Sequence, residues 1–320
     1  MRKNRIIFLG LLVALLVGVF KLMGQERVHY ISEQNAVVKD VVSEAGYMIS
    51  PKIVGGDSAD VVARPVSDVS SVDAATSSED QTCGSRIGAK LGLVRYLNSD
   101  ATVFERNPDG RWPIASITKL MTAIIASEQG LLTKNITFTN DMIATEGNAG
   151  GFKTGEMMTG GDIMKGMLLA SSNDAAEALA QAYGREGFLK LMNEKARSLR
   201  MSDTAYFDPS GLSPRNQSTP NDLYKLMSYL QSEHPEILEI TRQKKIVVTD
   251  LGIKRKRTIA NIDGFAGQAN FLGGKTGYIT EAEGNGNLVT LFTHNSQPFM
   301  IVVLGSPDRF GETRTLLKCI

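Results

Sequence analysis

A serine and a lysine stand three residues apart in Ser116-Ile117-Thr118-Lys119, the only S-x-x-K of the chain. On a helix this spacing places both side chains on one face, so the amine can reach the hydroxyl. A lysine whose pKa is lowered by burial can take the serine proton and create a nucleophile. Residues 120–126 are mostly apolar, so we expect Lys119 to be buried. The motif alone is weak evidence for a catalytic pair, because an N-cap serine and a solvated lysine have the same sequence pattern.

Two further short motifs carry polar groups that such a nucleophile needs. Ser171 and Asn173 form the only S-x-N of the chain and interrupt two apolar helical segments. The hydroxyl could relay a proton and the amide could orient a substrate, although a capped helix break explains the same letters. Lys275-Thr276-Gly277 places a cation beside a hydroxyl, which suits a carboxylate. A second copy, Lys153-Thr154-Gly155, lies in a glycine-rich loop and is assigned no catalytic role.

The segments around these motifs predict an α+β fold. Strand-like runs occupy residues 91–97, 102–106, 244–249, 257–262, 287–293 and 299–304. Helical patterns occupy residues 116–128, 162–170, 175–183 and 188–200, the segment opened by Thr219-Pro220, and the chain from about Arg309. Because strands lie at both ends and helices lie between them, we predict an antiparallel sheet with edges from both termini and an inserted helical lobe.

Residues 1–24 have the pattern of an export signal. Arg2, Lys3 and Arg5 precede the apolar run 6–20, which continues to Met23 and is just long enough to span a bilayer. The bulky residues before Gly24 disfavour cleavage, so we expect an uncleaved transmembrane anchor, with a cleaved signal peptide as the alternative. This predicts a single-pass protein of the cell membrane whose remaining chain is extracytoplasmic.

We expect residues 25–82 to form a flexible extracytoplasmic linker and residues 83–320 to form the catalytic domain, because no helical or strand period persists before residue 83. Cys83 and Cys319 bracket that domain in a compartment that tolerates disulfides, so they could be bridged; two unrelated buried thiols are the alternative.

Composition excludes several function classes. The 35 basic and 34 acidic residues give a formal charge of +1, which argues against a nucleic-acid partner. Three histidines and two cysteines are too few and too scattered for a metal site, and we expect no cofactor. The basic run Lys254-Arg255-Lys256-Arg257 is expected to be a solvated hairpin tip, with a binding patch for anionic wall polymer or lipid as the alternative.

In the order S-x-x-K, S-x-N, K-T-G, the three motifs resemble those of the penicillin-recognising serine D,D-peptidases. The chain most resembles the low-molecular-mass D-alanyl-D-alanine carboxypeptidases of peptidase family S11. The resemblance runs from about residue 91 to 304 and includes the text of residues 113–123, 171–176 and 208–212. It implies a β-lactamase/transpeptidase-like fold and cleavage of peptidoglycan stem peptides that end in D-Ala-D-Ala, with β-lactams as inhibitors.

The resemblance also implies roles for the motif residues. Ser116 would form the acyl-enzyme, Lys119 would be its base, and Ser171 would pass the proton to the leaving amine. The substrate-binding residues would be Asn173, Lys275, Thr276, Gly277 and Tyr278. Of these, Lys275 and Thr276 would bind the terminal carboxylate, and the backbone N–H groups of Ser116 and Tyr278 would form the oxyanion hole.

One departure and three alternatives accompany this interpretation. Relatives commonly carry a threonine two residues after the K-T-G, whereas Thr280 comes one position later and would occupy the opposite strand face. A D,D-endopeptidase would use the same residues. A β-lactamase would need a glutamate in an E-x-x-L-N context, which the sequence lacks. A catalytically silent penicillin-binding wall scaffold is the alternative from a different class.

Overall fold

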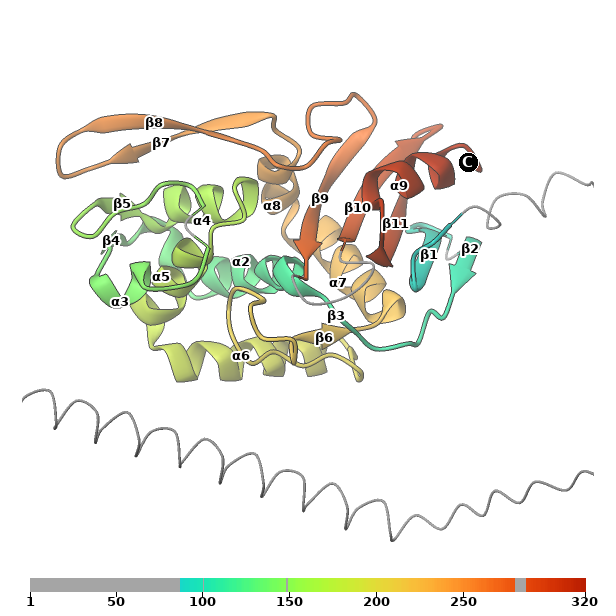
Figure 1. Ribbon diagram of the computed structural model, residues 1–320, viewed down its shortest axis with the longest axis horizontal. Coiled ribbons are helices and arrows are strands. Elements are labelled where there is room, and N and C mark those ends of the chain that lie inside the picture. The colour runs from blue at the N-terminus through green and yellow to red at the C-terminus, as the bar shows by residue number, and fades with distance from the viewer. Residues whose placement is uncertain (1–86, 100, 148, 280–285) are drawn as a thin grey trace, which may run out of the picture. The chain divides into compact units, whose positions relative to one another are not determined.

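A five-stranded antiparallel sheet is built from the two ends of the part of the chain that the computed structural model describes, residues 87–99, 101–147, 149–279 and 286–320 (Figure 1). Its strands, in the spatial order β2-β1-β11-β10-β9, are β2 (Thr102–Arg106), β1 (Leu91–Tyr96), β11 (Gln297–Ser306), β10 (Gly286–His294) and β9 (Phe271–Tyr278). The edge strands β2 and β9 come from opposite ends of the described chain, which confirms the predicted sheet.

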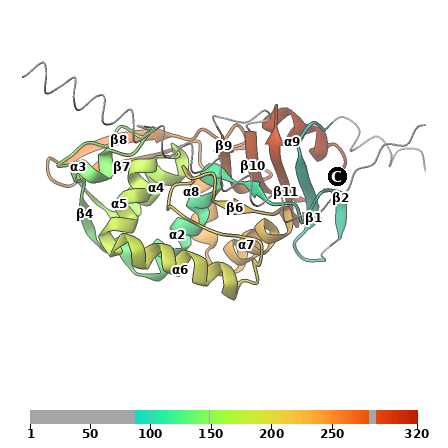
Figure 2. The ribbon, with the colours of Figure 1, turned by 60° about the horizontal axis from the view of Figure 1, so that its bottom comes forward.

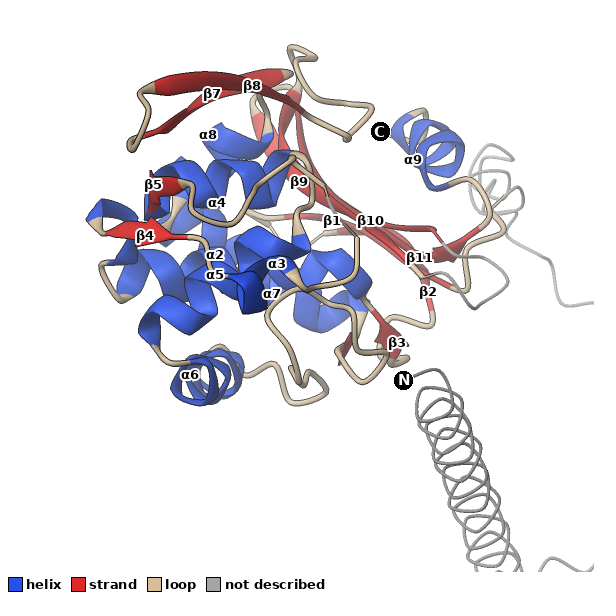
Figure 3. Ribbon diagram, turned by 60° about the vertical axis from the view of Figure 1, so that its left-hand side comes forward, coloured by secondary structure: helices blue, strands red, loops and turns tan. Residues whose placement is uncertain are grey.

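Strand β11 is buried on both faces because each face of the sheet covers a separate hydrophobic core. Successive side chains of a strand point to opposite faces, so Val302 joins the core on the helical side while Val303 joins the other. The second core is closed by α9 (Arg309–Leu317), which Figure 3 shows alone on its side of the sheet. The result is a layered α+β architecture with the sheet in the middle.

The helical lobe is organised around α2 (Lys119–Glu128), in which every residue from 119 to 126 is buried. Its neighbours are α4 (Gly160–Leu169), α5 (Asn173–Tyr183), α6 (Arg185–Ser198) and α8 (Pro235–Thr241), and α7 (Pro220–Glu233) connects the lobe to the sheet (Figure 2). A helix covered on all sides must be apolar all round, which the sequence of α2 predicts. Lys119 is the one charged residue in this buried stretch.

Threonine side chains cap two of the helices, and the cap at the start of α7 is the one that the sequence predicts. The Thr219 side chain accepts a hydrogen bond from the backbone N–H of Asp222 at 3.0 Å, and Pro220 occupies the first turn of α7. Thr159 caps α4 in the same way. Such caps satisfy backbone donors that have no partner within the helix.

Short elements lie between these longer helices and strands along the chain. They are β3 (Trp112–Pro113), η1 (Ala115–Thr118), η2 (Leu131–Thr133), β4 (Asn135–Thr137), α3 (Asn140–Ile143), β5 (Met157–Thr159) and β6 (Gln217–Ser218). Strand β3 pairs with β6, and β4 pairs with β5. The predicted helix at residues 116–128 therefore begins with one 3₁₀ turn, η1, before α2.

A separate two-stranded hairpin, β7 (Lys245–Asp250) and β8 (Arg255–Ala260), lies apart from the main sheet. The prediction that residues 254–257 form a solvated hairpin tip is wrong for Arg257, which is only partly exposed, whereas Arg255 is 54% exposed but forms an ion pair. The turn ends at Lys254, and Arg255 and Arg257 lie in β8, where both pair with the carboxylate of Glu156. Because they are two residues apart in a strand, their side chains share one face.

Several predictions concern residues outside the described ranges: the anchor 1–24, the linker 25–82, Cys83 and Thr280. They stay predictions, as does the pairing of Cys83 with Cys319, which follows α9. All described residues fall in one compact unit, Ala74–Ile320. Within them, no helix combines the length and apolar character needed to cross a bilayer.

Candidate active site

The backbone that leads to Ser116 has an unusual conformation held by close contacts. Ala115 has φ of +49°, a left-handed value that costs a non-glycine residue about 1–3 kcal/mol. Two glycines pack against this segment: an added Cβ would lie 2.0 Å from the Ala115 carbonyl oxygen at Gly211, and 2.6 Å from the Ile114 carbonyl oxygen at Gly277. Only glycine fits at either contact, so these residues fix the position of Ser116 in the first turn of η1.

Lys119 lies within the protein with its amine enclosed by three oxygen atoms. The side chain is fully buried, and its Nζ lies 2.9 Å from Ser116 Oγ. The same nitrogen lies 2.7 Å from Asn173 Oδ1 and 2.7 Å from the carbonyl oxygen of Ser210. Three segments far apart in the sequence thus meet at one nitrogen atom.

The protonation state of Lys119 follows from this environment. Burial, and then the nearby Lys275, hold the pKa of Lys119 well below its usual value, and Asp208 opposes them only partly. A neutral amine has two N–H groups and one lone pair. The oxygens of Asn173 and Ser210 can only accept, so they match the two N–H groups and leave the lone pair for the Ser116 hydroxyl. This arrangement can remove the proton of Ser116.

The Ser171-Ser172-Asn173 segment combines a helix cap with two side chains that face the lysines. The Ser172 hydroxyl accepts a hydrogen bond from the Ala175 N–H at 3.2 Å and caps α5, so the capping interpretation is right for this middle serine. Ser171 has a left-handed φ of +60°, and its Oγ lies 3.0 Å from Lys275 Nζ. Asn173 accepts from Lys119 and donates through Nδ2 to the Glu146 carbonyl at 2.6 Å.

Lys275 on the edge strand β9 supplies a second buried amine. Its Nζ contacts Ser171 and donates to the Thr276 carbonyl at 2.9 Å. Burial lowers the pKa of Lys275 to about 7; Asp263 opposes this effect and Arg309 adds to it. By contrast, Lys153 of the second K-T-G is exposed.

A cleft opens beside Ser116 where β9 ends. Its lining includes Ala115, Glu146, Leu212, Pro214, Tyr278 and Ile279. The Tyr278 side chain is 62% exposed, and the preceding Gly277 carbonyl accepts a hydrogen bond from Arg309 Nη1 at 2.5 Å. The basic groups of Lys275 and Arg309 beside this end of the cleft would attract a carboxylate.

A turn centred on Asp208 completes the site, and sequence reasoning did not assign it a role. One carboxylate oxygen of Asp208 accepts from the backbone N–H groups of Ser210, Gly211 and Leu212, and the other accepts from Ser213 N at 2.7 Å. These bonds fix the turn so that the Ser210 carbonyl accepts a hydrogen bond from Lys119 and Gly211 packs against Ala115. The letters Asp-Pro-Ser-Gly are a turn signal, whereas no sequence signal marks the Glu146 carbonyl that supports Asn173.

The structure therefore brings every predicted catalytic and substrate-binding residue to one junction between the sheet and the lobe. Ser116 and Lys119 come from η1 and the start of α2, Ser171 and Asn173 from the α4–α5 connection, and Lys275 to Tyr278 from β9. A serine with a neutral amine as base, next to cationic side chains, can carry out acyl transfer on a substrate that has a carboxylate.

Comparisons with known proteins agree with this chemistry. A family model described as D-alanyl-D-alanine carboxypeptidase, peptidase S11, matches residues 75–308. The chain is 34% identical over 233 residues to a D-alanyl-D-alanine endopeptidase of Pseudomonas aeruginosa, which covers 69% of this chain and 71% of that protein.

Solved structures with the same fold include a D-alanyl-D-alanine carboxypeptidase of Mycobacterium tuberculosis. It is 26% identical with a TM-score of 0.66, over 72% of this chain and 90% of that one. Penicillin-binding protein D2 of Listeria monocytogenes, in its ampicillin-bound form, is 26% identical with a TM-score of 0.63, over 73% of this chain and 98% of that one.

The turn at Asp208 yields a prediction about stability. Asp208→Asn keeps the size of the side chain but places an amide donor where an acceptor is needed, so we expect the free energy of unfolding to fall by about 2–3 kcal/mol. Urea unfolding at pH 7 measures this change. Asp203→Asn is the control, because Asp203 is exposed, and its cost should stay within about 0.5 kcal/mol. Equal costs for the two variants would contradict the role of the turn.

Proposed function

The chain belongs to the D-alanyl-D-alanine carboxypeptidase family, and on that premise we propose that it removes the terminal D-alanine of peptidoglycan peptides through an acyl-enzyme on Ser116. It is a serine-type hydrolase. The observation that carries the proposal is the buried amine of Lys119, whose Nζ lies 2.9 Å from Ser116 Oγ. The other two atoms that contact Nζ are the oxygens of Asn173 and Ser210, which can only accept hydrogen bonds.

In the proposed acylation, Lys119 takes the Ser116 proton as Oγ attacks the carbonyl carbon of the terminal peptide bond. The carbonyl oxygen gains negative charge, and the backbone N–H groups of Ser116 and Tyr278 stabilise it. When the C–N bond breaks, Lys119 gives the Ser116 proton to the amine of D-alanine through the Ser171 hydroxyl and becomes neutral again. Lys119 then takes a proton from the water that attacks the ester, and gives that proton to Oγ as the ester C–O bond breaks.

Substrate recognition in this proposal depends on β9 and on Asn173. The protonated Lys275 and the Thr276 hydroxyl bind the terminal carboxylate, because a charged donor and a neutral donor side by side match its two oxygens. Gly277 lets the strand end approach the Ile114 carbonyl, which brings the Tyr278 N–H towards the reaction centre. β-Lactams carry the same amide and carboxylate, and the ampicillin complex of the Listeria relative supports their binding at Ser116.

Cleavage of cross-links is a second candidate function, favoured by the 34% identity to a D-alanyl-D-alanine endopeptidase. Both reactions break a bond after D-alanine and need the same catalytic groups. Incubation with a linear pentapeptide and with a cross-linked dimer at equal concentration separates them. We expect a higher kcat/KM for the pentapeptide; a preference for the dimer would favour the endopeptidase.

We also propose that residues 1–24 anchor the protein in the cell membrane with the catalytic domain outside. The support is the basic flank followed by the apolar run 6–20. Membrane fractionation tests this proposal, since full-length protein found only in the soluble fraction would contradict it.

Removal of the proposed nucleophile gives the most direct test of the mechanism. Ser116→Ala should abolish labelling by a fluorescent penicillin and lower D-alanine release by at least about 10⁴-fold, because no other group replaces the nucleophile. Labelling gels and a coupled D-alanine assay measure the two effects. Ser202→Ala, at an exposed serine, should keep both activities. D-Alanine release that survives in Ser116→Ala would overturn the mechanism.

The pH dependence should report the charge of Lys275. Its pKa is about 7 in the free protein, so the cation is lost as the pH rises above 7 and the carboxylate loses a partner. We expect kcat/KM for a D-Ala-D-Ala peptide to fall by up to about tenfold per pH unit on this limb.

Lys275→Arg is the matched variant for that pH profile, because a guanidinium keeps its charge well above pH 9. Its kcat/KM should be lower at pH 7 but should lack the alkaline limb. A wild-type profile that is flat from pH 7 to 9 would show that the charge of Lys275 does not control substrate binding.

A further inference from the structure

The side chain of Asn173 depends on a glycine-rich loop. This cleft loop, residues 144–147 and 149–156, contributes Glu146 to the cleft lining and presents the Glu146 carbonyl to Asn173 Nδ2 at 2.6 Å. Four glycines of the loop, residues 147, 150, 151 and 155, have left-handed φ values between +63° and +87°. Glycine-rich backbone loses the most conformational entropy on ordering, so an external contact must hold the loop in place.

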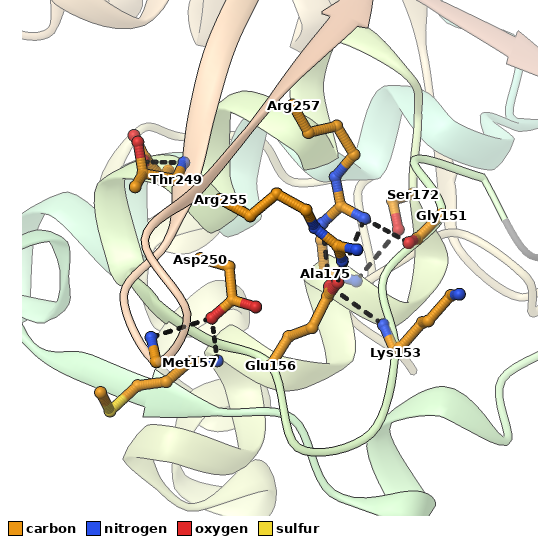
Figure 4. Close-up of polar contacts among 12 residues, drawn as sticks. Gly151, Lys153, Glu156, Met157, Ser172, Ala175, Thr249, Asp250, Arg255 and Arg257 are labelled. Carbon is orange, nitrogen blue, oxygen red and sulfur yellow. Dashed lines mark hydrogen bonds and ion pairs between the residues drawn. The ribbon is translucent and has the colours of Figure 1, made fainter.

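The buried carboxylate of Glu156, at the end of the cleft loop, provides such a contact. Glu156 is 6% exposed and pairs with two arginines of β8: Arg255 Nη2 lies 2.7 Å from Oε1, and Arg257 Nη2 lies 2.9 Å from Oε2 (Figure 4). The backbone N–H of Lys153 donates to the same carboxylate at 3.2 Å. One anion therefore joins the hairpin to the loop.

Arg257 holds the loop at a second point. Its Nη1 donates to the Gly151 carbonyl (Figure 4). Its guanidinium lies over the Phe152 ring, 4.9 Å from the centroid. Phe152 is 1% exposed and stacks on Phe138, with 4.9 Å between centroids. Arg257 is thus bonded to the glycine stretch itself, whereas Arg255 contacts only the anchor Glu156 among these residues.

The hairpin is fixed to the lobe independently of the arginines. The Leu251 N–H donates to the Met157 carbonyl at 2.7 Å, and the Thr249 N–H donates to Asp162 Oδ2 at 2.8 Å. The hairpin is therefore a supported frame against which Arg257 can hold the loop. Substitution of Arg257 leaves these bonds, and leaves Glu156 paired with Arg255.

We propose that Arg257, assisted by Arg255, is a positioning residue for the acylation of Ser116. Through Glu156 and the Gly151 carbonyl it fixes the cleft loop, so that the Glu146 carbonyl orients Asn173 and Asn173 orients the amine of Lys119. The inference rests on the proposed function of Ser116 and Lys119, and it assigns part of the run Lys254–Arg257 to the catalytic rate rather than to a surface role.

The test compares three neighbouring residues of β8 that differ in their contact with the loop. The acylation rate constant of the full-length protein by a fluorescent penicillin is measured per active site, with active sites counted from the final labelling stoichiometry. We expect Arg257→Gln to lower this rate constant about tenfold. Arg255→Gln should lower it less, because the Arg255 side chain is 54% exposed and contacts the loop only through Glu156. Lys256→Gln, exposed between the two arginines, should change it less than about twofold.

Final stoichiometry separates positioning from a loss of folded protein, because unfolded molecules lower the count of sites but not the rate constant of those that remain. Glu156→Gln should also lower the rate constant, and the variant with both substitutions should lose less than the product of the two single losses, because Glu156 and Arg257 act on the same loop. Arg257→Gln that reacts as fast per site as Lys256→Gln would overturn the proposal.

Hydrogen exchange of the cleft loop gives a readout that does not depend on activity. Amides of residues 149–156 should exchange faster in Arg257→Gln than in the wild type, and Lys256→Gln should match the wild type. Slow acylation with unchanged exchange would also overturn the proposal. A wild-type protein that is not acylated would contradict the proposed function alone, because exchange still reports whether Arg257 holds the loop.

Discussion

The site depends on a lysine amine kept out of water at hydrogen-bond distance from a serine hydroxyl. An ammonium group in this position would be strongly disfavoured by desolvation, so the neutral amine is the form the interior favours. The amine is tolerated because Asn173, Ser210 and Ser116 satisfy its hydrogen-bonding groups. Chemistry and stability therefore impose the same requirement: oxygens from three distant segments must meet at one nitrogen.

Much of the surrounding architecture meets that requirement. The lobe supplies the serine, the base and the amide, while the edge strand β9 supplies the second lysine. Backbone packs against backbone at two glycines of this junction: Gly277 of β9 contacts the Ile114 carbonyl, and Gly211 of the Asp208 turn contacts the Ala115 carbonyl, where a side chain would separate the segments. Left-handed φ values at Ala115 and Ser171 lie at the same junction, and the packing of the lobe against the sheet must offset their cost.

Basic residues in similar sequence contexts differ in burial and in contacts in this fold. The two K-T-G copies have the same letters, yet Lys275 is 2% exposed and contacts Ser171, whereas Lys153 is exposed. In the basic run of β8, alternation along the strand separates Arg255 and Arg257, which face Glu156, from Lys256. Burial and strand geometry, rather than residue type, decide which cations belong to the active-site region.

The sequence alone determined the class of fold, most elements and the residues of the site, because periodicity, caps and short motifs are local signals. Ser116, Lys119, Ser171, Asn173 and Lys275 could all be named from their motifs. Tertiary structure decided what depends on contacts between distant segments. It revealed the Ser210 carbonyl at Lys119, the Glu146 carbonyl at Asn173 and the pairing of Arg257 with Glu156. Backbone carbonyls carry no residue identity, and an ion pair across 101 residues leaves no local pattern, so neither could be read before the chain was folded.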